Sequence, residues 1–169
     1  MSTLDQAPLG KNSDNPSQYS PELLFPIART ENRLKIGIKN AEPPFFGIDI
    51  WNAYELSWLN VKGKPQLAIA TFFVPANSSN IIESKSWKLY LNSLNNHCFQ
   101  SNEELIQTLK NDLSKAAGAS VSVQLNSPEQ QCTKGMKEMT GKLLDRLDLE
   151  IDPKQLPDAA LLKSDTSLG

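Results

Sequence analysis

The sequence predicts an α+β domain in which an antiparallel β-hairpin is followed by two helices and then by further strands. Three observations predict this class: two adjacent strand-like segments at 49–59 and 66–74, two segments with helical spacing of apolar residues, and a return to strand-like composition at 120–125. With 169 residues, the chain is long enough for one ordinary domain with its own core.

The hairpin is predicted from alternation and from its turn. Bulky side chains occupy even-numbered positions of the first strand, so we expect them to share one face: Ile50, Tyr54, Leu56 and Trp58. Residues 61–64 form the predicted turn, because Gly63 takes a positive φ at little steric cost. Residues 66–74 are rich in β-branched and aromatic side chains, which suits the partner strand.

Two helices are predicted after the hairpin. The first spans about 84–95, with its apolar positions at i, i+3, i+4 and i+7: Trp87, Tyr90, Leu91 and Leu94. The second spans 102–117, where Ser101 and Glu104 form a capping box and Gly118 ends the helix. Its core-facing stripe consists of Leu105, Ile106, Leu109 and Leu113.

The flanking segments are less regular. Residues 1–21 are rich in Ser, Asn, Gln and Pro and predict a flexible arm before a domain at 22–152. Three prolines predict an irregular extended segment at 23–46. Phe45 and Phe46 are expected to pack in the core, and the alternative is that they cover a ligand at a seam between modules. A weak strand is predicted at 148–151, and residues 153–169 have the composition of a linker or terminal tail towards a second module.

Composition excludes some partners. The formal net charge is −2 and the basic residues are scattered, so we expect no nucleic-acid footprint. No apolar run has membrane-spanning length and the amino terminus lacks the pattern of a signal peptide, so we expect a cytoplasmic protein with free thiols at Cys98 and Cys132. His97 beside Cys98 lacks the close ligand pairs of a structural zinc site, so no metal is expected.

The most informative segment precedes the first helix, at Glu83-Ser84-Lys85-Ser86. A first helical turn carries unpaired N–H groups and a positive dipole end, and Lys85 adds a full charge, which predicts a phosphate site. Glu83 lies just outside that turn, where its carboxylate can bind the N–H groups of a heterocycle. The alternative is that Ser84 is an N-cap and that Lys85 and Lys88 are solvated surface charges.

The run Glu83-Ser84-Lys85-Ser86-Trp87-Lys88-Leu89-Tyr90, with the segments 47–60, 62–66 and 80–82, resembles the QueF family. These NADPH-dependent nitrile reductases convert 7-cyano-7-deazaguanine to its 7-aminomethyl form in queuosine biosynthesis, a tRNA modification. The resemblance covers about residues 10–125 and is specific to the amino-terminal module of the two-module form. It implies a tunnelling fold, with β-β-α-α-β-β order, two helices on one face of an antiparallel sheet, and sheets joined edge to edge in homo-oligomers.

The resemblance also implies roles for individual residues. Ile82, Glu83 and Ser84 match positions that contact 7-cyano-7-deazaguanine, and Ser84 and Lys85 match positions that contact NADPH. The family's nucleophilic Cys is followed seven positions later by an Asp proton donor. Here the residues seven positions after Cys98 and Cys132 are Leu105 and Met139, so we expect no catalytic residue in this chain and no activity from it alone.

Two other classes of protein stay open at this point. One is a non-catalytic member of the same fold that binds a purine or pterin or acts as an assembly partner. The other, more remote, is a cyclohydrolase-like enzyme, against which the missing metal-ligand pairs argue. Glu55, acidic within a predicted strand, is expected to have a structural role and to pair with a nearby base.

Overall fold

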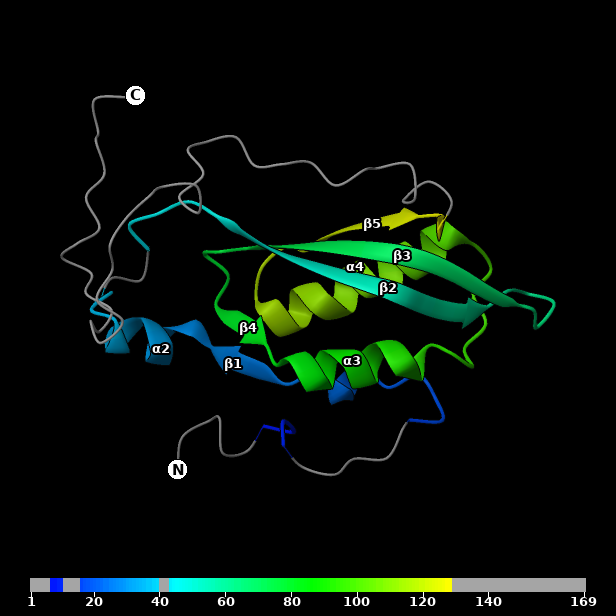
Figure 1. The fold of residues 1–169 in the computed structure, drawn as a ribbon, viewed down its shortest axis with the longest axis horizontal. Coiled ribbons are helices and arrows are strands. Elements are labelled where there is room, and N and C mark those ends of the chain that lie inside the picture. Colours follow the sequence, from blue (N-terminus) through cyan, green and yellow to red (C-terminus); the bar gives the residue numbers. More distant parts are fainter. Residues whose placement is uncertain (1–6, 11–15, 40–42, 129–169) are drawn as a thin grey trace, which may run out of the picture. The chain divides into compact units, whose positions relative to one another are not determined.

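The computed structural model describes residues 7–10, 16–39 and 43–128, all within one compact unit, Met1–Gly135. Figure 1 shows the order of its elements. They are η1 (Pro21–Leu23), β1 (Pro26–Ala28), α2 (Arg29–Lys35), β2 (Ile48–Leu59), β3 (Pro65–Pro75), β4 (Asn80–Ile82), α3 (Ser84–Ser93), α4 (Asn102–Ala117) and β5 (Ser122–Asn126). The predicted α+β class is therefore confirmed.

The strands form two antiparallel sheets. The larger has the order β2-β3-β5, and the smaller pairs β1 with β4. The predicted hairpin is confirmed, and its turn contains Gly63 at a φ of 72° with Asn60 N–H donating to the Lys64 carbonyl at 3.0 Å. Because β3 is central, the outer edge of β2 pairs, within the described residues, through one isolated parallel bridge between Leu59 and Cys98.

The prediction that the four bulky even-numbered residues of the first strand share one face was wrong. Ala53 pairs with Ala70, but Leu56 pairs with Ala68, so one extra residue lies between them in β2. This β-bulge shifts the alternation. Leu56 and Trp58 are buried as predicted, whereas Ile50 and Tyr54, which precede the shift or lie in it, are exposed.

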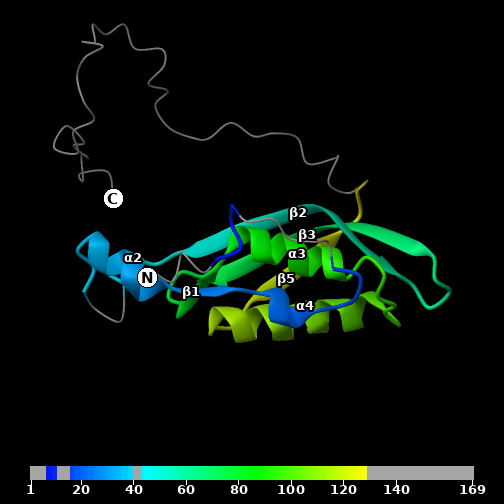
Figure 2. The same cartoon turned by 90° about the horizontal axis from the view of Figure 1, so that it is seen from below.

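Both long helices lie on the same side of the larger sheet (Figure 2). The stripe of α4 is confirmed, with Ile106 half-buried and the three leucines fully buried: Leu105, Leu109 and Leu113. Ser101 Oγ accepts from Glu104 N–H at 3.3 Å, and Glu104 accepts in return from Gln100 N–H at 2.6 Å. Gly118 ends the helix at a φ of 68°, also as predicted.

The segment before β2 is more ordered than the prolines indicated. It contains β1 and α2, and the Arg29 guanidinium binds the Asp49 carboxylate of β2 and donates to Ser78 Oγ at 3.0 Å. Phe45 and Phe46 are exposed, so their predicted place in the core was wrong. The strand predicted at 148–151, the tail at 153–169 and most of the arm lie outside the described residues.

Candidate functional site

The predicted signature lies where β4 ends and α3 begins. Antiparallel pairing of β1 with β4 places Pro26 opposite Ile82, and Glu83 N–H continues the ladder by donating to the Phe25 carbonyl at 2.9 Å. Ile82 is buried at this junction. The chain therefore enters α3 from a strand whose position is set by a segment more than fifty residues earlier in the sequence.

Glu83 is the N-cap of α3. Its Oε1 accepts from Lys85 N–H at 2.8 Å and its Oε2 accepts from Ser86 N–H at 2.7 Å. Trp87 N–H donates to the Glu83 carbonyl at 3.0 Å. With 6% of its surface exposed, Glu83 is fixed at the positive end of the helix, where a carboxylate is favoured.

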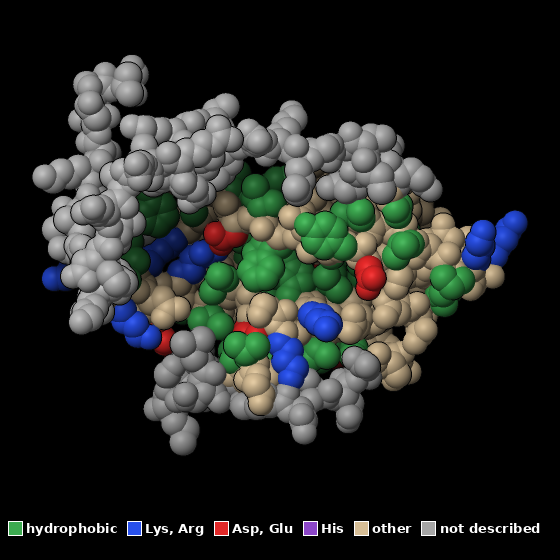
Figure 3. Space-filling view, in the orientation of Figure 1, with side chains coloured by type: hydrophobic (Ala, Val, Ile, Leu, Met, Phe, Trp, Pro, Cys, Tyr) green, Lys and Arg blue, Asp and Glu red, His purple; other side chains and the backbone are tan. Residues whose placement is uncertain are grey.

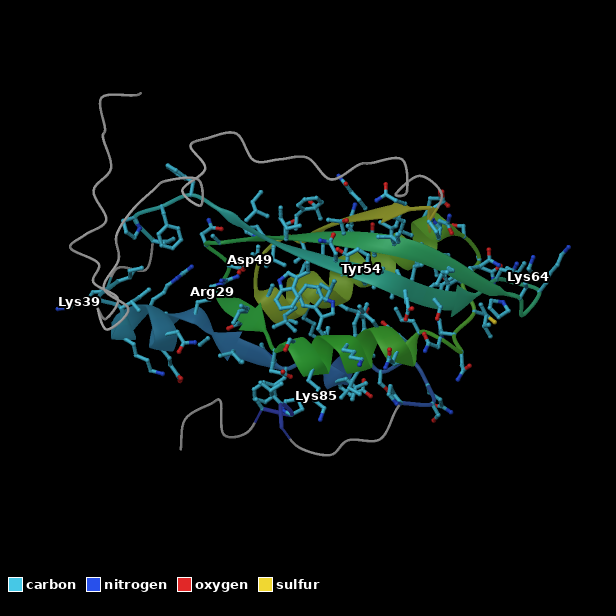
Figure 4. The ribbon with its side chains drawn as sticks, viewed as in Figure 1. Arg29, Lys39, Asp49, Tyr54, Lys64 and Lys85 are labelled. Carbon is cyan, nitrogen blue, oxygen red and sulfur yellow. The ribbon has the colours of Figure 1, made fainter. Side chains whose placement is uncertain are left out.

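This arrangement corrects two expectations about the turn. Ser84 is exposed and is the first residue of the helix, so it is not the N-cap. The N–H groups of Lys85 and Ser86 are bonded to Glu83, so they are not open to a phosphate. Lys85 is half-buried and extends from the first turn of α3 on the side away from β2 (Figure 4).

A buried polar stripe runs along the side of α3 that faces residues 19–25. Ser86 Oγ donates to the Glu83 carbonyl at 2.7 Å and accepts from Phe25 N–H at 3.0 Å. Ser93 Oγ accepts from Ser20 N–H at 3.2 Å, two turns further along. Ser86 belongs to the segment that the sequence predicted as a phosphate site, but it is fully buried and joins the helix to the preceding segment.

Two tyrosines complete this stripe. Tyr19 and Tyr90 each donate to Asp112 Oδ2 at 2.6 Å, which ties the segment before η1 to both long helices. Burial, and next the bond to Asp112, raise the pKa of both phenols well above the usual range. The last residues of the predicted arm therefore belong to the folded module. Neither spacing nor charge pattern marks Asp112 as their shared acceptor.

The opposite side of α3 borders a cavity of about 270 Å³ against the edge strand β2. Its apolar wall includes Trp51, Phe72 and Trp87, and Ser84 is the one predicted site residue in its lining. Figure 3 shows apolar side chains gathered between β2 and α3, with charged side chains around them.

The sequence also singled out His97, Cys98 and Glu55. The His97 ring lies 5.1 Å from that of Tyr19 and 4.7 Å from that of Phe99, while Cys98 is an exposed free thiol. Among the described residues there is no group of three or more potential metal ligands. Glu55 forms no ion pair with a described residue, so its predicted pairing with a base was wrong. None of the helices described here is long and apolar enough to cross a membrane.

Fold and turn together define a class, an α+β module that fixes a carboxylate at a strand-to-helix junction. The family model described as "Nitrile reductase, 7-cyano-7-deazaguanine-reductase N-term" matches residues 15–125. The chain belongs to this family. The matched residues include the whole signature and every described strand and helix except the last residue of β5.

The curated relatives of the chain have names that match this family. The chain is 56% identical over 162 residues to the NADPH-dependent 7-cyano-7-deazaguanine reductase of Paraburkholderia xenovorans. It is 52% identical over 166 residues to the protein of the same name from Cupriavidus pinatubonensis. These matches cover 96% and 98% of this chain, but only 58% and 60% of the relatives. The chain thus spans less than two thirds of their length.

Proposed function

We propose that this chain is the amino-terminal, tunnelling-fold module of a two-module NADPH-dependent nitrile reductase that converts 7-cyano-7-deazaguanine to 7-aminomethyl-7-deazaguanine. Ile82, Glu83 and Ser84 bind the nitrile substrate, and Ser84 and Lys85 bind NADPH. A second module supplies the nucleophilic thiol, because neither Cys98 nor Cys132 has an Asp seven positions later. The parent protein is cytoplasmic and assembles through sheet edges, of which β2 is one.

The observation that carries this proposal is the fixed carboxylate of Glu83. A carboxylate has about four lone-pair sites, and the two α3 amides use two of them. The exposed Ser84 hydroxyl also donates to Oε1, at 3.4 Å, and must turn away before a ligand can use that site. The remaining sites can accept the ring N–H and the 2-amino group of a deazaguanine together, as two charge-assisted hydrogen bonds. Since the α3 amides already hold the side chain, little conformational entropy is lost when the ligand binds.

The residues near the turn also suit the cofactor. An exposed hydroxyl at Ser84 and the ammonium groups of Lys85 and Lys88 can bind phosphate oxygens, although the first-turn amides cannot. NADPH supplies hydride when bound. The part of this chain is to hold the phosphates near the carboxylate that orients the nitrile.

The test is calorimetric titration of the two-module parent protein with 7-cyano-7-deazaguanine, comparing Glu83→Ala with Glu83→Asp. Aspartate is a strong N-cap, so Glu83→Asp keeps the helix start while withdrawing the carboxylate from the ligand. Both variants should weaken nitrile binding by roughly ten- to hundredfold, from the loss of charge-assisted hydrogen bonds. Glu83→Gln should also bind weakly, because its NH2 group faces a donor.

Glu104→Ala is the matched control, since Glu104 accepts a backbone N–H at the start of the other long helix. Its nitrile affinity should equal that of the wild type. Lys85→Ala should raise the NADPH concentration needed for half-maximal rate while leaving nitrile affinity unchanged. Wild-type nitrile affinity in a folded Glu83→Ala protein would show that this carboxylate is only a helix cap, and the proposal would be withdrawn.

A second measurement tests the division of roles between the modules. This 169-residue chain alone, mixed with NADPH and 7-cyano-7-deazaguanine, should show no loss of NADPH absorbance above a blank without protein. Turnover by the isolated chain would place a nucleophile within it and contradict the proposal.

A further inference from the structure

The cavity between β2 and α3 is distinct from the carboxylate at the turn. Its lining includes Ser84 but neither Ile82 nor Glu83. Its volume of about 270 Å³ lies just below the roughly 300–1,000 Å³ typical of small-molecule pockets. It therefore suits one ring system and not a whole dinucleotide.

Aromatic rings form its wall. Trp51 and Trp87 stack with centroids 4.8 Å apart and ring planes inclined by 28°, and Phe72 meets Trp87 edge-on at 5.3 Å. Trp87 and Phe72 are buried, whereas Trp51 keeps part of its surface exposed. A rigid indole with a free surface beside a cavity of this size favours a planar ring, because base-to-aromatic stacking stabilises such contacts.

Two opposite charges line the same cavity. Glu55 and Lys88 are both exposed, and neither forms a hydrogen bond or an ion pair with another described residue. Glu55 lies in the β-bulge of β2, and bulges on edge strands redirect side chains next to binding sites. The carboxylate can accept from an amino group on a ring, and the ammonium can bind a phosphate beside it.

We infer that this cavity binds the adenine end of a phosphorylated dinucleotide, with the adenine stacked on Trp51, its amino group on Glu55 and the neighbouring phosphate on Lys88. The inference rests on the proposed function, because it adds a subsite to the proposed cofactor contact at Ser84. A cofactor phosphate near Ser84 would be continuous with a ring in this cavity, since Ser84 lines it.

The adenine end fits better than the nicotinamide end. The hydride-donating ring must lie against the nitrile carbon and so close to the ligand held by Glu83, which does not line this cavity. Adenine also carries the exocyclic amino donor that Glu55 can accept. In a 2′-phosphorylated dinucleotide, the adenosine ribose adds the second negative charge that suits Lys88.

The experiment titrates adenosine 2′,5′-bisphosphate into the two-module parent protein, followed by tryptophan fluorescence and by calorimetry. Adenosine and nicotinamide mononucleotide are the other ligands, and Trp51→Leu, Glu55→Gln and Lys88→Ala are the variants. Tyr54→Leu is the matched control for Trp51→Leu, because Tyr54 adjoins Glu55 without lining the cavity. Lys64→Ala is the matched control for Lys88→Ala, because Lys64 is a lysine near the hairpin tip (Figure 4).

The bisphosphate should bind the wild-type protein, and nicotinamide mononucleotide should not displace it. Loss of stacking in Trp51→Leu should weaken binding roughly tenfold. Glu55→Gln and Lys88→Ala, as exposed partners, should each weaken it by about two- to fivefold. Of the three cavity variants, Lys88→Ala alone should leave adenosine affinity unchanged. Both controls should bind all ligands like the wild type.

Absence of bisphosphate binding, equal losses in the controls, or displacement by nicotinamide mononucleotide would overturn the inference. These outcomes are separable from failure of the proposed function. If Glu83-dependent nitrile binding holds in the parent protein while the bisphosphate fails here, only this site is wrong. If the bisphosphate binds here but nitrile affinity does not depend on Glu83, only the assignment of the turn is wrong.

Discussion

The two sides of α3 differ in whether their polar side chains have hydrogen-bond partners. On the side facing residues 19–25, the buried polar side chains of the helix and its cap all have partners: Glu83, Ser86, Tyr90 and Ser93. On the side facing β2, aromatic rings surround a cavity, and the charges of Glu55 and Lys88 have no described partner. The first side stabilises the module, and the second is where we infer that a ligand binds.

Buried polar groups explain the contrast. A buried donor or acceptor without a partner costs about 1–3 kcal/mol. On the side of α3 that faces residues 19–25, every buried polar group therefore needs a hydrogen-bond partner. Exposed charges at a cavity mouth remain hydrated and carry no such penalty. Substitutions of the paired polar groups facing residues 19–25 should therefore lower the free energy of unfolding, whereas substitutions of the exposed charges facing β2 should mainly change ligand affinity.

The largest loss of stability is expected at Asp112, whose Oδ2 accepts from both Tyr19 and Tyr90. Asp112→Ala leaves two phenols without their acceptor, one of them fully buried, and should cost roughly 3 kcal/mol. Urea denaturation measures this loss. Asp49→Ala, which removes a different carboxylate that binds Arg29, shows whether loss of any paired acid has the same effect. A change below that of an exposed substitution would contradict the comparison.

Glu83→Ala is the next largest, with an expected cost of about 2 kcal/mol, because the N–H groups of Lys85 and Ser86 lose their acceptor at a buried helix start. Glu83→Asp should recover most of that stability, since aspartate also caps helices. Thermal denaturation of the three proteins gives the answer. Equal destabilisation by alanine and aspartate would mean that the longer side chain matters for packing and not only for the cap.

The tyrosine pair predicts a sensitivity to alkali. Because both pKa values are raised in the folded state, the unfolded chain loses these protons first as the pH rises past the ordinary tyrosine pKa of about 10. Their contribution to stability is present below that pH and declines above it. Denaturation at several pH values should show a shallower alkaline decline in Tyr90→Phe than in wild type. Tyr54→Phe, at an exposed tyrosine, should follow the wild type.

The smallest effects are expected at the cavity. Lys88→Ala and Glu55→Gln should each change the free energy of unfolding by no more than about 0.5 kcal/mol, because both side chains are exposed and bonded to no described residue. The same denaturation assay checks this. A loss as large as that of Glu83→Ala would show that the side facing β2 also holds the module together, and the comparison would fail.

Local signals were sufficient to predict much of the fold. Both long helices, the hairpin turn at Gly63 and the cap of α4 at Ser101 depend on residues within a few positions of one another, so their patterns are visible in the sequence. The signature was also correctly placed at the start of a helix. Residues 29–35 were missed, because the surrounding prolines suggested an extended segment, whereas Arg29 in α2 is bound to Asp49 across the fold.

The tertiary structure decided the strand register and the burial of polar groups, because both depend on partners that are distant in the sequence. The β-bulge of β2 depends on its register with β3, and a shift of one residue reverses which side chains face the core. Ser86 is buried and Asp112 is half-buried, and Phe25, Tyr19 and Tyr90 supply the hydrogen bonds that these polar groups need there. The sequence alone therefore determined the helices and the signature, while long-range pairing determined which groups are buried and which side of α3 stays open, because a polar group can be buried only where its partner arrives.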